Sequence, residues 1–373
     1  MTQRELVGKF NAIRDYMNKN FLQREEVVDG CLTALVARQH VLLLGPPGTA
    51  KTNLIAALAS CLTGGQHFQW LVTKFTTPEE LFGPVSLEAL ERDSYRRVTA
   101  GKLPEATTAM LDEVFKSSSA ILNTLLTIIN ERRFYNDGTV TEVPLITVFG
   151  ASNEVPAGDE EVALAAFADR FLLWYEVNYL EEDGVFARML RLNNSGRRPE
   201  ITIDEVLQAG EMARQVVVND DTIDALVLLR RQLRDEGITV SDRRWRQVIS
   251  LLQAQAFLHS DVRVQPQRDL MILKHALWTA PDQKITVQKI VRNIIDPFGE
   301  AIEEVVLEAK EIYQNAMDKG DAPTGAEALQ KLKALRTQLD ELRAKGAVVD
   351  KYVNLLHDYH REVLNKCMGI DLL

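Results

Sequence analysis

Cysteine and long apolar runs are both scarce in this 373-residue chain. The three cysteines, Cys31, Cys61 and Cys367, are scattered and form no CxxC pair, which argues against a disulfide framework and a zinc site. No apolar run approaches the length of a membrane span, and the first residues lead into an amphipathic stretch rather than a signal peptide. We therefore expect a cytoplasmic protein without a membrane span.

The chain also lacks an excess of positive charge. It holds 43 Lys and Arg against 53 Asp and Glu, for a net charge of -10, which makes nucleic acid an unlikely partner because phosphate backbones attract basic surfaces. Hydrophobic residues make up 46% and charged residues 26%, close to average globular usage. The length predicts two or three packing units.

Short apolar runs alternate with helical patterns in the first half. Buried strands are predicted at residues 41–44, 109–111, 145–151 and 171–177, and helices at residues 53–62 and 118–131. This alternation is typical of a parallel sheet covered by helices on both faces. The first half is therefore predicted to be an α/β domain spanning residues 1–193.

The second half has the pattern of helices alone. Successive helices are predicted at residues 204–218, 221–235, 241–259 and 266–279, and the all-helical unit is assigned to residues 194–296. In the extension, residues 297–373, a turn-rich stretch at residues 319–325 precedes leucines spaced by three and four, Leu332, Leu335, Leu339 and Leu342. That spacing predicts a short coiled coil or a C-terminal helical hairpin.

A phosphate-binding loop follows the first strand and opens a helix. Its residues are Gly45, Pro46, Pro47, Gly48, Thr49, Ala50, Lys51 and Thr52. Backbone N–H groups at a helix start bind phosphate, while Lys51 supplies a charge and the Thr52 hydroxyl a Mg²⁺ ligand. Ala50 stands where the simple pattern has its second glycine.

An acidic pair, Asp112 and Glu113, ends the strand predicted at residues 109–111. One carboxylate of such a pair holds Mg²⁺ and the next polarises the attacking water. The alternative is a solvated acidic turn, but the phosphate loop one crossover earlier favours the metal and catalytic roles.

Four segments in this order, GPPGTAKT, MLDEVFK, VFGASNE and FADRF, resemble AAA+ ATPases of the MoxR family. The segments FTTPEELFGPVSLEAL, ILNTLLTIINERRF and VSDRRWRQVISLLQAQAF are similar to the RavA branch, whose members partner a von Willebrand factor A domain protein. The resemblance covers the chain to about residue 281. It implies an AAA+ core, an all-helical lid, ATP and Mg²⁺ as ligands, and a homo-oligomeric ring, a hexamer, that hydrolyses ATP and remodels or chaperones a client protein.

The same resemblance implies roles for residues outside the phosphate loop. Asn153 matches the sensor 1 amide, which orients the attacking water, and Arg170 matches the arginine finger, which reaches a neighbouring subunit's ATP. Arg243 resembles the sensor 2 residue of the lid, with Arg244 as the alternative.

Two insertions are similar to those of the helix-2-insert AAA+ proteins, at residues 82–102 and 133–144. The second holds the hairpin turn signal Asn136-Asp-Gly138. Phe134 and Tyr135 on this hairpin are expected to pack against their own helix, with substrate contact as the alternative.

Two other functions remain open from sequence. One is a nucleic-acid-stimulated motor of helicase or restriction type, and the other a nucleotide-gated scaffold without hydrolysis. His357 and His360 lie three apart on a predicted helix, but without a third ligand they are expected to face solvent rather than hold a metal.

Overall fold

The computed structural model describes residues 1–154, 161–192 and 197–369. The chain forms two compact units, Met1–Val291 and Arg292–Leu373, which are described separately. The change from α/β to all-helical sequence that was predicted at residues 193–196 lies outside the described residues. Among the residues described, no helix is both long and apolar enough to cross a membrane.

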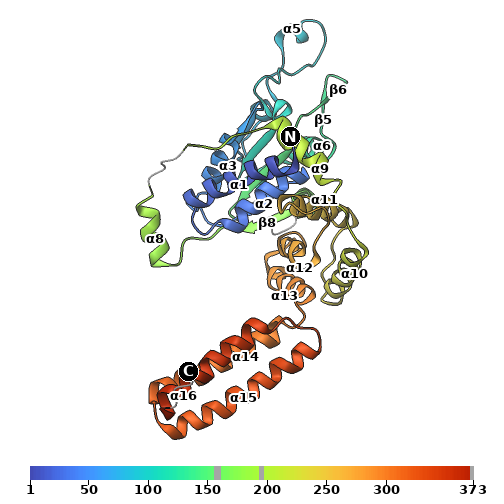
Figure 1. Cartoon of the computed structure of the whole chain (residues 1–373). Coiled ribbons are helices and arrows are strands. Elements are labelled where there is room, and N and C mark those ends of the chain that lie inside the picture. Colours follow the sequence, from blue (N-terminus) through green and yellow to red (C-terminus); the bar gives the residue numbers. More distant parts are fainter. Residues whose placement is uncertain (155–160, 193–196, 370–373) are drawn as a thin grey trace. The chain divides into compact units, whose positions relative to one another are not determined.

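A five-stranded parallel sheet forms the centre of the first unit, which confirms the α/β prediction (Figure 1). Its strand order is β3-β4-β7-β1-β8. The strands are β1 (Val41–Leu44), β3 (His67–Leu71), β4 (Thr108–Asp112), β7 (Thr147–Ser152) and β8 (Leu173–Glu176). Every residue of β1 and β7 is buried, as expected for central strands covered on both faces. Because all strands run the same way, their carboxyl ends share one edge of the sheet.

Strand β3 has no counterpart among the predicted strands. Its sequence HFQWL alternates between buried and more exposed positions and contains no continuous apolar run. It pairs only with β4, at the edge of the sheet. An edge strand is less enclosed than a central one, so the buried-run criterion misses it.

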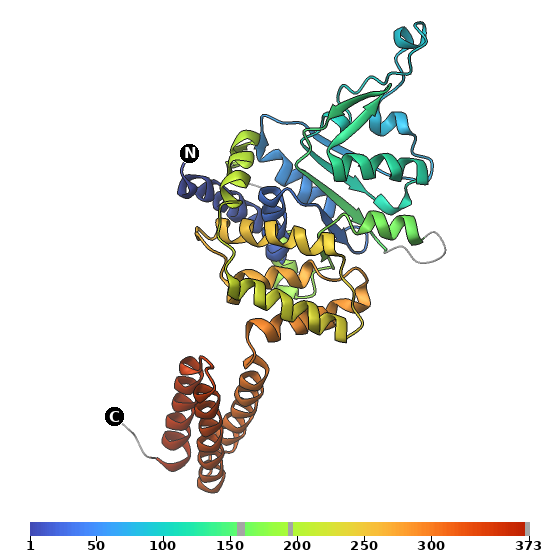
Figure 2. The same cartoon turned by 90° about the vertical axis from the view of Figure 1, so that its right-hand side faces the viewer.

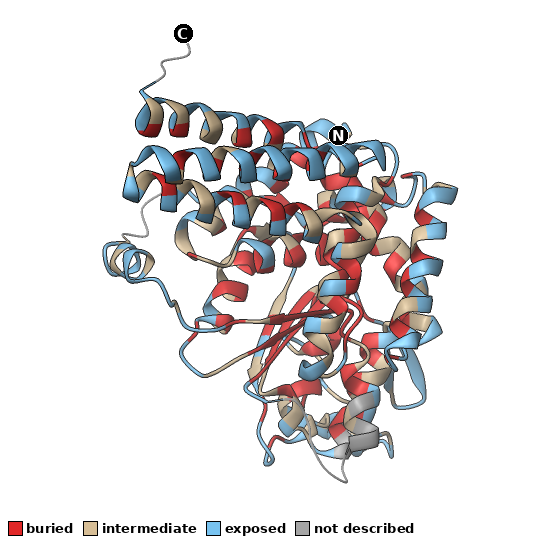
Figure 3. Ribbon diagram, turned by 90° about the horizontal axis from the view of Figure 1, so that it is seen from below, coloured by how far each residue is buried: buried red, intermediate tan, exposed pale blue. Residues whose placement is uncertain are grey.

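Helices cover the sheet and then form the all-helical part of the unit (Figures 1 and 3). Those before and between the strands are α1 (Gln3–Asn20), α2 (Glu25–Ala37), α3 (Lys51–Ser60), α4 (Pro78–Phe82), α5 (Leu87–Leu90), α6 (Ser119–Glu131), α7 (Glu161–Ala168) and α8 (Asp183–Leu190). Those that follow are α9 (Ile203–Ala213), α10 (Asp220–Asp235), α11 (Asp242–Leu258), α12 (Pro266–Asp269) and α13 (Lys284–Ile295). Two small sheets pair β2 (Leu62–Thr63) with β9 (Ile201–Thr202) and β5 (Arg133–Asn136) with β6 (Thr139–Glu142).

The helix predicted at residues 266–279 is divided into an α-helical and a 3₁₀ segment and ends at His275. Helix α12 ends at Asp269, and the 3₁₀ helix η3 (Leu270–His275) follows. The buried Asp269 carboxylate accepts from the Gln265 N–H, at 2.7 Å, and contacts Arg268. The next residues are buried on several sides rather than along one stripe, so tertiary packing decides the conformation here.

From residue 299 to residue 369 the second unit forms three helices rather than the predicted hairpin alone. They are α14 (Gly299–Lys319), α15 (Ala322–Ala344) and α16 (Asp350–Met368). The predicted leucine seam lies on α15, where Leu332, Leu335 and Leu339 are buried in one apolar cluster with residues of α14 and α16. The turn before α15 is short because the Asp321 carboxylate caps the helix, accepting from the Thr324 N–H at 2.8 Å.

Candidate active site

The loop after β1 has the backbone geometry of a phosphate site. A Cβ on Gly45 would lie 2.2 Å from the carbonyl oxygen of Val177, so only glycine fits there. At the other end Ala50 has a φ of 65°, in the left-handed region that favours glycine. Helix α3 begins at the next residue, Lys51, so the unpaired N–H groups of its first turn adjoin the loop. Such a helix start attracts anions.

The Lys51 ammonium lies over this loop. Its Nζ donates to the carbonyl oxygens of Gly45 at 2.7 Å and Pro46 at 2.9 Å. Burial lowers the pKa of Lys51, and the carboxylates of Asp112 and Glu113 partly offset this by raising it. The positive charge is thus held between the loop and two acidic side chains.

Thr52 and Asp112 meet at the carboxyl end of β4. The Thr52 hydroxyl donates to Asp112 Oδ2 at 2.8 Å. Mg²⁺ prefers oxygen ligands and usually binds through one or two carboxylates together with substrate phosphates. One hydroxyl and one carboxylate beside a phosphate loop fit such an ion. Among the described residues no group of three or more His, Cys, Asp or Glu could hold a metal by itself.

Glu113 and Asn153 extend the same site from two neighbouring strands. Asn153 follows β7, and its Nδ2 donates to Glu113 Oε1 at 2.5 Å. Asn153 Oδ1 also accepts from Lys51 Nζ, at 3.4 Å, and Lys116 lies 3.3 Å from Glu113. The carboxylate therefore has a fixed position in front of the phosphate loop.

A cavity of about 270 Å³ joins these groups. Its lining includes nine residues that the sequence predicted: Pro47, Gly48, Thr49, Ala50, Lys51, Thr52, Asp112, Glu113 and Asn153. They come from the carboxyl ends of β1, β4 and β7, and the shared direction of the strands brings them together.

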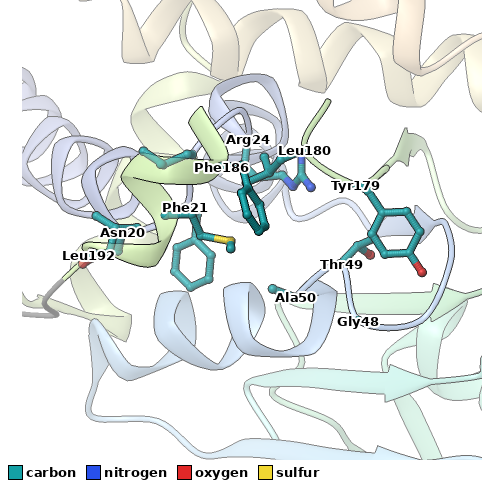
Figure 4. Close-up of a pocket in the computed structure, with 12 residues that line it drawn as sticks. Asn20, Phe21, Arg24, Gly48, Thr49, Ala50, Tyr179, Leu180, Phe186 and Leu192 are labelled. Carbon is teal, nitrogen blue, oxygen red and sulfur yellow. The ribbon is translucent and has the colours of Figure 1, made fainter. Parts of the chain in front are cut away.

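An apolar pocket of about 380 Å³ adjoins the phosphate loop and shares Gly48, Thr49 and Ala50 with it (Figure 4). Phe21, between α1 and α2, and Phe186, on α8, line it. The sequence did not predict this pocket, because its walls come from segments far apart in the chain and carry no motif. The flat ring system of a nucleotide's base fits an apolar pocket of this kind beside a phosphate site.

Arg170 and Arg243 lie near the amino ends of the strands, at the end of the sheet opposite the phosphate loop. Arg170 precedes β8, and both line a cavity of about 350 Å³ with Arg38, Gln39 and His40, which precede β1. At about 3.3 Å per residue, even four-residue β1 separates the two edges by about 13 Å. The structure therefore does not bring these two arginines to the phosphate loop of their own chain.

Several polar atoms in this second cavity have no partner. They are Nε and Nη1 of Arg170, Nε of Arg243 and Oε1 of Gln247, all buried among the described residues. Buried guanidinium groups normally pair with an acceptor. Three of the four atoms are nitrogens that can donate a hydrogen bond, and they belong to two arginines that line the cavity.

Arg243 and Arg244 differ in their surroundings. Arg244 is fully buried and donates to the carbonyl oxygens of Phe171 at 2.9 Å and Leu172 at 2.9 Å. It also donates to the Asp169 carboxylate at 3.3 Å, which Arg243 contacts as well. Arg244 therefore joins α11 to the start of β8, whereas Arg243 lines the cavity, and only Arg243 is placed to meet a ligand.

The two predicted insertions contact each other (Figure 2). Residues 133–144 form the β5–β6 hairpin, and its turn residues Asp137 and Gly138 have the positive φ values of a type I′ turn. Phe134 is buried and stacks on Phe82, at 5.9 Å between ring centroids, while Tyr135 is 57% exposed. Phe134 is thus packed inside the fold, as expected, but its ring partner lies on α4 rather than on its own helix, and the packing prediction is wrong for the exposed Tyr135.

Comparison with known proteins supports the family expectation. The model of the MoxR domain in the MoxR-vWA-beta-propeller ternary systems matches residues 8–218, and an AAA lid domain model matches residues 221–291. Two uncharacterized proteins of Methanocaldococcus jannaschii are similar along nearly their whole length. MJ0079 is 34% identical, over 96% of this chain and 96% of its own length. MJ0812 is 35% identical, over 94% of this chain and 95% of its own length.

A solved structure shares the fold. It is a candidate ATPase from Cytophaga hutchinsonii, 18% identical, with a TM-score of 0.63 over 79% of this chain and 95% of its own. At that identity the likeness concerns the fold alone. Because the MoxR-domain model covers more than half of the sequence, the chain belongs to the MoxR family of AAA+ ATPases.

Proposed function

We propose that the chain hydrolyses ATP with Mg²⁺ as one subunit of a homo-oligomeric ring, a hexamer. The observation that carries this proposal is the separation of two half-sites on one sheet. The phosphate loop and acidic pair lie at one edge, and Arg170 and Arg243, with unpaired buried nitrogens, lie at the other. One chain cannot close both halves around one nucleotide, but two adjoining chains can.

In the proposed site each residue has a separate task. Lys51 and the start of α3 bind the phosphates, and the apolar pocket beside Gly48 receives the base. Mg²⁺ bound at Thr52 and Asp112 would neutralise phosphate charge. Glu113 accepts a proton from the attacking water, and Asn153 holds that carboxylate and the water in place.

Arg170 and Arg243 of the neighbouring subunit act on the same nucleotide. Their guanidinium groups offset the charge that develops on the transferred phosphoryl group, and an arginine in this role is worth about 10³- to 10⁵-fold in turnover. Since these arginines and the phosphate loop sit on different chains, the nucleotide state alters the contact between subunits.

We further propose that the ring remodels or chaperones a client protein in the cytoplasm together with a von Willebrand factor A domain protein. The support is the family model, which describes MoxR domains in MoxR-vWA-beta-propeller systems. The three RavA-like segments support placement near that branch, and this too is a proposal.

Dilution of the protein tests the shared site. ATP turnover per chain should rise steeply with protein concentration, and Arg170→Ala should lower it at least about 10³-fold. Arg231→Ala, on the exposed face of α10, is the matched control and should leave turnover unchanged. Turnover that is independent of concentration and of Arg170 would contradict the proposal.

The Glu113→Gln chain tests the partner. It should bind ATP without hydrolysing it, so the ring stays closed and retains its client and the von Willebrand factor A domain protein in a pull-down. Lys51→Ala, which removes the phosphate-binding charge, should retain neither.

A further inference from the structure

We propose that Arg38 is a third phosphate-contacting residue, acting with Arg170 and Arg243 on the ATP bound by a neighbouring copy of the chain. This inference rests on the proposed function, because it requires a site shared between two copies. It adds a residue for which neither the sequence motifs nor the family resemblance gives a role.

Arginines outnumber carboxylates at the cavity at the amino ends of the strands, where Asp169 contacts one of them, Arg243. Four arginines line it, Arg38, Arg132, Arg170 and Arg243, and no carboxylate is among its lining residues. Burial, and then the charge of Arg132, lower the pKa of His40 well below its ordinary value, so this histidine is neutral. A cluster of partly buried like charges is unfavourable unless an anion joins it.

One of the four arginines is already satisfied by the fold. Arg132 Nη1 donates to the Ile129 carbonyl at 2.6 Å and contacts His40 Nε2 at 2.9 Å. Its Nη2 donates to the carbonyl oxygens of Arg38 and Ile146, both at 3.1 Å. Arg132 therefore ties α6, α2 and β7 together and fixes the backbone of Arg38. Of the other three arginines, Arg243 is paired with Asp169, whereas Arg38 and Arg170 have no carboxylate partner among the described residues.

Arg38 is held in position but its side chain is free. It ends α2 with a left-handed φ of 54°, and its N–H donates to the Leu35 carbonyl at 3.3 Å. Within the described part of the chain its guanidinium makes no hydrogen bond or ion pair. Arg170 and Arg243 contribute unpaired buried nitrogens to the same cavity. Arginines from three separate parts of the chain thus line one cavity.

The anion that fits is the phosphate chain of a nucleoside triphosphate held by another copy. It carries several negative charges, and guanidinium groups bind phosphate through paired N–H donors. The chain's own phosphate loop lies at the opposite edge of the sheet, so the ligand must come from a neighbour.

Arg38→Gln tests the inference, because it removes the charge and keeps a long side chain. ATP turnover should fall about 10- to 100-fold, the worth of one hydrogen bond to a charged group. Arg231→Gln, on exposed α10, is the matched control and should keep full turnover. The midpoint of thermal unfolding of both variants shows whether they are folded, and Arg38→Lys repeats the test with the charge retained.

Mixing two chains then separates a shared role from a structural one. Lys51→Ala cannot bind ATP but offers intact arginines, whereas Arg38→Gln keeps an intact phosphate loop. Their mixture should regain turnover well above the sum of the two alone, because some interfaces then combine an intact pocket with an intact Arg38.

Each outcome decides the matter. Rescue in the mixture supports the inference, while full turnover of Arg38→Gln, or loss without rescue, overturns it. Arg170→Ala mixed with Lys51→Ala is run in parallel. If that mixture regains turnover but the Arg38→Gln mixture does not, the proposed function stands and Arg38 has no part in it. If the Arg170→Ala mixture does not regain turnover either, the proposal of a site shared between two chains is wrong.

Discussion

At the scale of single residues, Ala50 shows how one position can oppose local preference. It occupies the left-handed region at the end of the phosphate loop, φ 65°, directly before α3. An L residue there costs about 1–2 kcal/mol, whereas glycine adopts the conformation freely but loses about 0.5–1 kcal/mol of chain entropy on folding. The loop therefore holds strain that glycine would relieve.

Ala50→Gly should raise the free energy of unfolding by about 0.5–1 kcal/mol, the difference between these two costs. Ala56→Gly, inside α3, is the control and should lower it by about the same amount because glycine disfavours helix interiors. Urea denaturation of both variants measures this. A loss of stability in Ala50→Gly would mean that the loop needs the alanine methyl group.

Substitution of one of two adjacent arginines on α11 should mainly lower stability, and substitution of the other should mainly lower ATP turnover. Arg244→Met removes a buried charge and leaves the carbonyl oxygens of Phe171 and Leu172 without a donor, so the free energy of unfolding should fall by about 3–5 kcal/mol. Arg243→Gln should cost less than about 1 kcal/mol because its ion pair with Asp169 is partly exposed. It should instead lower ATP turnover. Denaturation and turnover measured on both variants check this, and equal stability losses would contradict it.

At the scale of elements, the hairpin turn holds the first insertion. Asn136 exchanges two hydrogen bonds with the Arg97 backbone, at 2.7 and 3.0 Å, and Asp137 Oδ1 accepts from the Tyr95 N–H at 3.1 Å. The hairpin lies in the chain between Glu113 and Asn153, which touch each other in the site.

Asp137→Gly should release this contact while keeping the positive φ of the turn. The Tyr95 amide should then exchange its hydrogen at least about tenfold faster, because it loses a bond to a charged acceptor. Hydrogen exchange followed by mass spectrometry measures the rate. Asp137→Asn keeps an acceptor oxygen, so the Tyr95 amide should exchange as slowly as in the unchanged chain. An unchanged exchange rate in Asp137→Gly would mean that Asp137 does not hold the first insertion.

Helix α2 carries an acid-sensitive contact with η3. Glu26 lies 2.5 Å from Lys274 Nζ and 3.1 Å from His275 Nε2, and the hydrogen bond from His275, followed by Lys274, lowers the pKa of Glu26 from 4.5 to about 2. A carboxyl whose pKa is lowered on folding adds stability at pH values above its unfolded pKa. That stability is lost as the pH falls from about 5 to about 2.

Glu26→Gln should therefore lose less stability than the unchanged chain between pH 5 and pH 3. The difference should be about 1 kcal/mol or less, since Glu26 is largely exposed. Urea denaturation at the two pH values measures it. Glu25→Gln, one residue away and without such partners, should follow the unchanged chain, and identical profiles for Glu26→Gln would contradict the assignment.

Sequence reasoning found the elements that carry a repeating pattern or a motif. The strands around Val41 and Leu111 and the site residues beside them follow from apolar runs ending in loops. Edge strand β3 was not predicted because its sequence HFQWL contains no continuous apolar run. The 3₁₀ form of residues 270–275 was not predicted because it depends on packing against distant parts of the chain. Arg243 and Arg244 differ because their hydrogen-bond acceptors come from distant parts of the chain. Two adjacent arginines in a sequence do not show which of them is buried by such acceptors.

At the scale of the whole molecule, each of the two compact units has buried apolar residues of its own within the part of the chain that the structure describes. The first unit ends at Val291, and the cluster of the second is built only from α14, α15, α16 and the segment between the last two. A unit with its own core can unfold by itself. We therefore expect two thermal transitions rather than one.

Leu335→Ala should separate the two thermal transitions. Leu335 is 3% exposed at the centre of the second cluster, and its truncation should cost about 2–5 kcal/mol, enough to lower one transition by several degrees. Leu229→Ala, fully buried on α10 in the first unit, is the converse control and should lower only the other transition. Scanning calorimetry of the full chain follows both. If either substitution shifted both transitions equally, the two units would unfold as one cooperative structure, and the helical extension would belong to the folding unit of the ATPase core.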